Sequence, residues 1–220
     1  DALIDKGVKK DEAILRVIRD LIASSKSVRF EGNGYGEEWV KEAARRGLSN
    51  IRDTPRALDV WERKETKALF AEMGVLSPVE VEARHEIELH SYTLKVQIES
   101  RVVGDLAQNH IIPTAITYQN RLIENVRGLR EVLAPEKAKK ATAVQVKLIE
   151  EISEHIATIV TMVDDMIEAR KKANNLEDAR DKAIAYCDKV KPFLEKIRYH
   201  ADKLELLVDD ELWPLPKMRE

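Results

Sequence analysis

The chain has 220 residues, of which 35% are charged and only 5% aromatic, with 8 glycines and 7 prolines. This composition is typical of long helices with large polar surfaces and argues against a sheet protein. The formal net charge of −3 is too small to attract nucleic acid or an anionic membrane surface over a distance, so we expect neither as a partner.

Two further features bear on the location of the protein. No apolar run approaches the roughly 18 residues that a membrane-spanning helix needs, and the N-terminal residues do not form a signal peptide. The single cysteine, Cys187, cannot form an internal disulfide, which is typical of a reducing compartment. We therefore expect a cytoplasmic location.

The first predicted helix ends near Ser25. Its apolar residues recur at intervals of three and four and therefore share one face: Ile14, Val17, Ile18, Leu21 and Ile22. No obvious partner for this face follows in the sequence. Because residues 2–4 already belong to the helical pattern and residue 1 is Asp rather than Met, we expect the chain to be cut from a longer protein.

A turn and a second helix follow. Residues 28–30 are predicted to be extended, and residues 31–36 form a glycine-rich turn because glycine and asparagine favour positive φ. The next helix is predicted over residues 37–46, with Gly47 at its C-terminal end.

Two dipeptides mark later helix starts. Thr54-Pro55 and Ser77-Pro78 each combine an N-cap side chain with a proline at the first helical position, where the missing N–H is no loss. A helix between them passes through residues 69–70 and should end at Gly74.

Long helices fill the rest of the chain. The pattern that starts at Ser77 continues to residues 134–135, with a kink rather than a break at Pro113, because no glycine or polar cluster accompanies that proline. Two heptad seams follow, joined by a tight connection at residues 174–175. The first seam contains Ile149, Ile152, Ile156, Ile159, Val163 and Met166, and the second contains Leu176, Ala179, Ala183, Tyr186, Val190, Phe193 and Ile197.

These elements predict an all-α protein in which long antiparallel helices form a three- or four-helix bundle, preceded by shorter helices. A two-helix hairpin would leave a third apolar face in water. We divide the chain into a short-helix connecting region, residues 1–76, and a long-helix bundle, residues 77–220.

Two motifs suggest ligand binding, and each has a simpler structural explanation. Gly32, Gly34 and Gly36 precede a helix whose amides could bind phosphate, but their spacing matches neither the dinucleotide-binding motif nor the P-loop, which favours a structural turn. Glu82 and His85 have the Glu-x-x-His spacing of di-metal bundles. The second copy of that motif is missing, so an ordinary helix contact is favoured over a metal site.

Polar residues on the helix before Pro113 are the strongest candidates for a site: Arg101, Asp105, Asn109 and His110. Arg101 and Asp105 can pair at i,i+4. A polar pocket at the kink is one explanation, and a satisfied polar network or a face docked on another domain is the favoured one.

Nucleophilic catalysis finds no support in the sequence. No serine–histidine or cysteine–histidine pairing is recognisable from spacing, and Cys187 on its apolar seam is interpreted as a small core residue. We therefore predict no catalytic, cofactor-binding or metal-binding residue in this chain.

Three blocks of sequence are more specific than these patterns: RFEGNGYGEEWVKEAARRGL (residues 29–48), ARHEIELHSYTLKVQIESRVVGDLAQNHIIPTAITYQNRLIENVRGL (residues 83–129) and ELWPLPKMRE (residues 211–220). Together they resemble the C-terminal region of type III glutamine synthetases, the long-chain bacterial form of that enzyme, over nearly the whole chain. The blocks depart from that family's pattern at four positions: Gly36, His85, Ser100 and Met218.

The resemblance implies a parent enzyme that ligates ammonia to glutamate with ATP, with divalent Mg or Mn held by carboxylates on a catalytic sheet N-terminal to this region. Nothing here matches those motifs, so no catalytic residue is carried over. The resemblance implies a helical structural or interaction region that is not catalytic in isolation, with the catalytic domain of the same protein and neighbouring subunits of an oligomer as partners. A regulatory bundle that senses a nitrogen metabolite or nucleotide at the kink and a free-standing helical scaffold are the alternatives.

Overall fold

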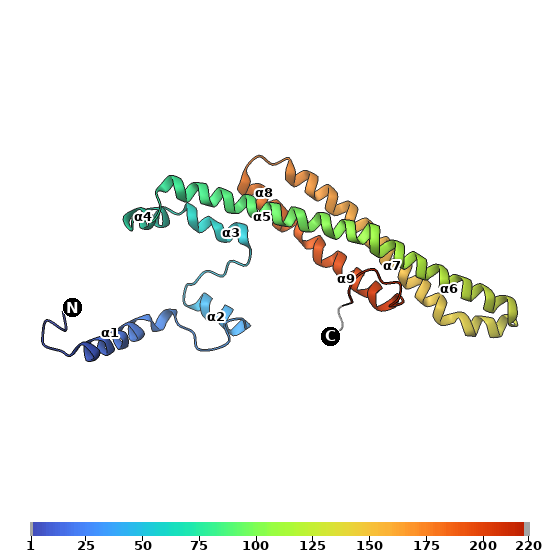
Figure 1. The fold of residues 1–220 in the computed structure, drawn as a ribbon, viewed down its shortest axis with the longest axis horizontal. Coiled ribbons are helices and arrows are strands. Elements are labelled where there is room, and N and C mark those ends of the chain that lie inside the picture. Colours follow the sequence, from blue (N-terminus) through green and yellow to red (C-terminus); the bar gives the residue numbers. More distant parts are fainter. Residues whose placement is uncertain (1, 218–220) are drawn as a thin grey trace. The chain divides into compact units, whose positions relative to one another are not determined.

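The computed structural model describes residues 2–217, which contain helices and turns but no strand (Figure 1). The all-α prediction is therefore confirmed. The chain divides into two compact units, Asp1–Arg52 and Asp53–Glu220. This division lies before the domain boundary predicted at residues 76 and 77, because the short helices after residue 53 pack on the first long helix.

The first unit holds α1 (Lys10–Ser24), a 3₁₀ turn (Ser25–Val28) and α2 (Glu37–Arg45). The helix α1 ends where predicted, but the prediction that residues 2–4 belong to it is wrong. Those residues form a separate turn that ends at Gly7, whose φ is +84°. The predicted extended stretch begins only at Arg29, because Val28 still belongs to the 3₁₀ turn.

The C-terminal end of α2 confirms the prediction for Gly47, whose φ is +73°. The Gly47 N–H donates to the Ala44 carbonyl at 3.0 Å, and the Leu48 N–H donates to the Ala43 carbonyl at 2.9 Å. These are the paired hydrogen bonds of a Schellman motif, which requires the positive φ that glycine adopts without strain.

The second unit begins with α3 (Thr54–Leu58), a 3₁₀ turn (Asp59–Glu62) and α4 (Lys64–Glu72). Asp53, rather than the predicted Thr54, is the N-cap residue of α3, because its Oδ1 accepts the Arg56 N–H at 3.0 Å. The helix α4 ends just before Gly74, as predicted, and Gly74 has a φ of +64°.

The long helix predicted from Ser77 consists of α5 (Pro78–Leu106), a π-helical turn (Ala107–Ile111) and α6 (Ile112–Val132), which run on as one helix in Figure 1. The predicted start is confirmed by a capping box, in which Ser77 and Glu80 each accept from the other's backbone N–H. The π turn ends two residues before Pro113, which has no backbone N–H to donate to the preceding turn. The helix is wider at this turn and continues past the proline without a break, as predicted.

The heptad seams lie on α7 (Pro135–Asn174) and on α8 (Ala179–Ala185) followed by a π turn (Tyr186–Val190) and α9 (Lys191–Leu207). The helix α6 packs along α7, α7 packs along α9, and α5 packs on α8 and α9. The seam residues are fully or partly buried, apart from the more exposed Leu176, and most of them belong to one core. This second unit is the three-helix form of the predicted bundle.

Gly104 marks a close approach of α5 to α7. A Cβ there would lie 3.5 Å from Val163 Cγ1 and 3.6 Å from Met166 Cε, which is ordinary contact. We expect Gly104→Ala to raise the free energy of unfolding by about 0.5–1 kcal/mol, because alanine loses less backbone entropy in a helix. Gly104→Leu should lower it by about 1–3 kcal/mol through overpacking.

Gly128 on α6 is the matched control, since no atom lies within 4 Å of the position of its Cβ. Chemical denaturation of the four variants checks the pair of predictions. A destabilised Gly104→Ala would contradict the ordinary contact distance, and a Gly104→Leu as stable as Gly128→Leu would contradict the close approach.

Residues 208–217 fold back against the end of α9. Leu212, Trp213 and Leu215 pack against the bundle core. Lys217 Nζ donates to the carbonyl oxygens of Glu205 at 2.9 Å and Val208 at 3.3 Å, so an ammonium group occupies the C-terminal end of α9. We call residues 208–217 the C-terminal strap. Met218, one of the four departures from the family pattern, lies outside the described residues.

Candidate functional site

The four residues predicted at the kink lie on the solvent side of the long helix. Arg101, Asp105, Asn109 and His110 are all exposed. Asn109 Nδ2 donates to Asp105 Oδ1 at 2.6 Å, so the structure brings two of the four together. The ion pairs of residues 2–217 do not include Arg101 with Asp105, the pairing that their spacing allows. The Asp105 carboxylate is bound by Asn109 in the next turn instead.

These four side chains face solvent, so this part of the helix carries polar residues and buries none of the four. No contact of the described residues tests the ligand-sensing alternative, which stays a prediction.

Glu82 and His85 make contacts with neighbouring segments rather than with each other. Glu82 Oε1 accepts from Lys67 Nζ at 2.7 Å, and the buried His85 places Nδ1 3.3 Å from Glu62 Oε1. Both contacts fix α4 and the preceding 3₁₀ turn to α5. Among residues 2–217, no group of three or more His, Cys, Asp or Glu side chains is placed to hold a metal ion.

Two arginine–aspartate pairs, which the sequence did not reveal, join the short helices to α8 and the following π turn. Arg180 donates to both carboxylate oxygens of Asp59, at 2.6 and 2.7 Å, and Arg56 donates to both of Asp188, at 3.1 and 2.7 Å. These bonds lower the pKa of both aspartates. Such bidentate pairs fix orientation as well as charge, so they hold α3 in place.

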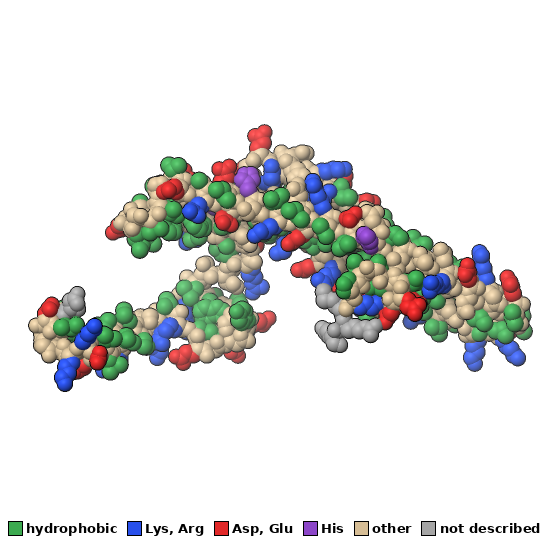
Figure 2. Space-filling model, viewed as in Figure 1, with side chains coloured by type: hydrophobic (Ala, Val, Ile, Leu, Met, Phe, Trp, Pro, Cys, Tyr) green, Lys and Arg blue, Asp and Glu red, His purple; other side chains and the backbone are tan. Residues whose placement is uncertain are grey.

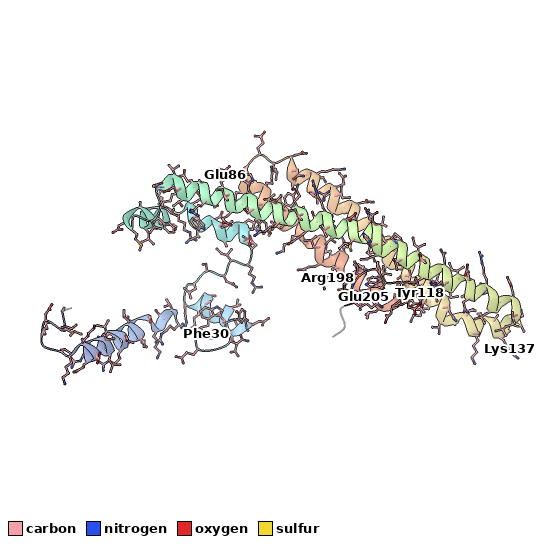
Figure 3. The ribbon with its side chains drawn as sticks, viewed as in Figure 1. Phe30, Glu86, Tyr118, Lys137, Arg198 and Glu205 are labelled. Carbon is pink, nitrogen blue, oxygen red and sulfur yellow. The ribbon has the colours of Figure 1, made fainter. Side chains whose placement is uncertain are left out.

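The glycine-rich segment is a turn, in agreement with the favoured interpretation. Asn33 Oδ1 accepts the Tyr35 N–H at 3.0 Å, and the Asn33 carbonyl accepts the Gly36 N–H at 3.0 Å. The asparagine side chain thus organises the entry to α2. Phe30, labelled in Figure 3, packs on Trp39 at a ring-centroid distance of 4.7 Å.

Cys187 is partly buried on the second seam. It lies next to Tyr92, which is also partly buried. Burial, together with Cys187, raises the pKa of Tyr92. This position fits the interpretation of Cys187 as a small packing residue.

A histidine pair between α7 and α9 is the most unusual titratable group of the bundle. His155 Nδ1 and His200 Nδ1 lie 2.9 Å apart, with ring centroids 5.1 Å apart. One ring must donate and the other must accept, so one Nδ1 has to stay unprotonated. Burial and the neighbouring His155 lower the pKa of His200 below its ordinary value.

This pair predicts a pH dependence of stability. Because the folded-state pKa of His200 is lowered, the unfolded chain binds more protons, and the free energy of unfolding falls as the pH drops from about 6.5 through the folded-state pKa. Thermal unfolding from neutral pH downward should show this loss, and His200→Gln should flatten it. An unchanged slope in His200→Gln would contradict the assignment.

Comparison with known families identifies the fold. Residues 13–130, more than half of the chain, match the model of the glutamine synthetase C-terminal domain. The chain belongs to this family. The matched range runs from α1 to the end of α6, which includes two of the three blocks that carry the resemblance. The resemblance predicted from the sequence is thereby confirmed.

Relatives of the chain carry the same name. A glutamine synthetase of Bacteroides fragilis is 49% identical over 220 residues, which is 100% of this chain and 30% of that protein. A type-3 glutamine synthetase of Dictyostelium discoideum is 28% identical over 96% of this chain and 29% of that protein. A glutamine synthetase of Butyrivibrio fibrisolvens is 26% identical over 97% of this chain and 30% of that protein.

The chain thus spans about 30% of the length of the curated relatives that it matches. Within residues 2–217, no helix is both long and apolar enough to cross a membrane. Many large apolar side chains of α1 and α5 are exposed, and they direct attention to the surfaces of these two helices.

Proposed function

We propose that this chain is a helical interaction region of a cytoplasmic glutamine synthetase and is not catalytic by itself. The observation that carries the proposal is the family match over residues 13–130. The parent enzyme would ligate ammonia to glutamate with ATP and a divalent metal, Mg or Mn. We propose that ATP and the metal are bound by other parts of that enzyme, since the motifs that bind them are not recognised in this sequence.

The helix α1 supplies the physical argument for an interaction role. Its apolar stripe, defined by Ile14, Val17, Ile18, Leu21 and Ile22, is 46–61% exposed at every position. A single face with so many large apolar side chains is unstable in water unless another surface covers it. We propose that the catalytic domain of the same protein covers this stripe, and that neighbouring subunits contact the bundle.

Substitutions on α1 in the full-length parent enzyme test this role. Ile18→Glu and Leu21→Glu introduce charge into the stripe and should lower both the unfolding temperature and glutamine formation. Arg19→Glu is the matched control, because Arg19 is 79% exposed on the other side of the helix. Equal effects of the control and the stripe variants would overturn the proposal.

A further inference from the structure

The helix α5 is apolar on two opposite faces. Its buried face contacts the bundle through residues spaced by three and four: Val81, His85, Leu89, Thr93, Val96, Ser100 and Gly104. On the opposite face four large apolar side chains are exposed: Ile87 by 60%, Leu94 by 55%, Ile98 by 52% and Val102 by 49%. We call these four residues the α5 stripe.

The four positions share one face because their separations of seven and four residues are close to whole helical turns. Figure 2 shows hydrophobic side chains among charged ones along this part of the molecule. A helix that is apolar on every side is normally covered on every side. Only one of the two faces of α5 is covered by the bundle.

We propose that the α5 stripe pairs with the same stripe of a second copy of the chain, in antiparallel orientation. When the two-fold axis passes between Leu94 and Lys95, Leu94 and Ile98 each lie within about one helical turn of the partner's Leu94. Ile87 then lies opposite the partner's Val102. This inference deepens the proposed interaction role, on which it rests.

Charge selects the antiparallel orientation. In that orientation the exposed Arg84 lies opposite the partner's Asp105, at both ends of the stripe. A parallel pairing would place Arg84 against the partner's Arg84 and Asp105 against the partner's Asp105. Opposite charges at the rim of an apolar contact favour one orientation, and like charges disfavour the other.

The size of the contact sets the expected strength. Covering four half-exposed aliphatic side chains and their neighbours on each copy removes on the order of 1,000 Å² from water, near the lower end for specific interfaces. The pairing is therefore a reversible dimer of the isolated chain, with micromolar affinity rather than a permanent association.

Sedimentation velocity of the full 220-residue chain, from low micromolar to near-millimolar concentration, tests the pairing. We expect a monomer–dimer equilibrium that Leu94→Glu or Ile98→Glu shifts to monomer by at least tenfold in Kd. Val144→Glu is the control, because Val144 is 70% exposed on α7, outside the stripe. A chain that stays monomeric throughout, or a Val144→Glu variant that dissociates equally, overturns the proposal.

Two further variants test orientation. Arg84→Asp should weaken the dimer, and adding Asp105→Arg should restore it. In a Cys187→Ala background, Leu94→Cys should form a disulfide-linked dimer on oxidation, whereas Ile87→Cys should not. Ready cross-linking of Ile87→Cys would show a parallel pairing and refute the antiparallel one. Because these tests use the chain without a catalytic domain, their outcome is separate from that of the α1 variants.

Discussion

Replacing Ile159 with alanine should lower the free energy of unfolding by about 2–5 kcal/mol. Ile159 is completely buried on the first heptad seam, in the core where α7 meets α6 and α9. Truncation removes three heavy atoms from water-excluded packing and leaves a cavity that rigid neighbouring helices cannot close. Denaturant titration followed by circular dichroism measures the loss.

Val160→Ala is the matched control for this prediction. Val160 follows Ile159 on the same helix but is 39% exposed, so its truncation should change the free energy of unfolding by no more than about 0.5 kcal/mol. If the two substitutions had equal effects, the seam would not be the core of the bundle.

Trp213→Ala should cost about 3–5 kcal/mol, because it removes the largest apolar group of the C-terminal strap. Trp213 is only 9% exposed and belongs to the bundle core, although it lies after the last helix. Its indole Nε1 is buried and has no hydrogen-bond partner among residues 2–217, so within that range packing rather than polar contact stabilises the residue. Trp213→Phe should therefore be much less harmful than Trp213→Ala.

The same unfolding titration checks the strap. Leu206→Ala is the control, since Leu206 is 79% exposed on α9 and its truncation should be nearly neutral. Loss of the strap should also release Lys217 from the Glu205 and Val208 carbonyls, and so increase amide exchange in the last turn of α9. Full protection of that turn in Trp213→Ala would contradict the account.

Local signals explain which parts of the fold could be predicted. Ser77 and Glu80, three residues apart, are sufficient for a capping box, and Gly47 and Gly74 are sufficient for helix ends with positive φ. The heptad seams could also be predicted, because each depends only on the spacing of apolar residues within a short stretch of sequence. Where two cap residues adjoin, as at Asp53 and Thr54, the sequence left the helix start ambiguous by one residue.

Contacts between distant segments could not be predicted. The bonds from Arg180 to Asp59 join residues 121 positions apart, and His155 and His200 are separated by 45. Both depend on the relative sliding and rotation of packed helices, which periodicity does not determine.

The exposure of the four polar residues near the kink could not be predicted for a related reason. The helix α5 carries apolar residues on both faces, so the pattern alone could not show which side faces the core. Whether Arg101, Asp105, Asn109 and His110 face solvent or the core is therefore decided by how the helices pack. A complete three- and four-residue periodicity count would have revealed the second stripe, although not its partner.

Glutamine formation is the most direct test of the central claim, that this chain is a non-catalytic helical region of a glutamine synthetase. The purified chain, supplied with glutamate, ammonia, ATP and Mg²⁺ or Mn²⁺, should form no glutamine, whereas the full-length parent enzyme should form it under the same conditions. Glutamine formation by the chain alone would contradict the account.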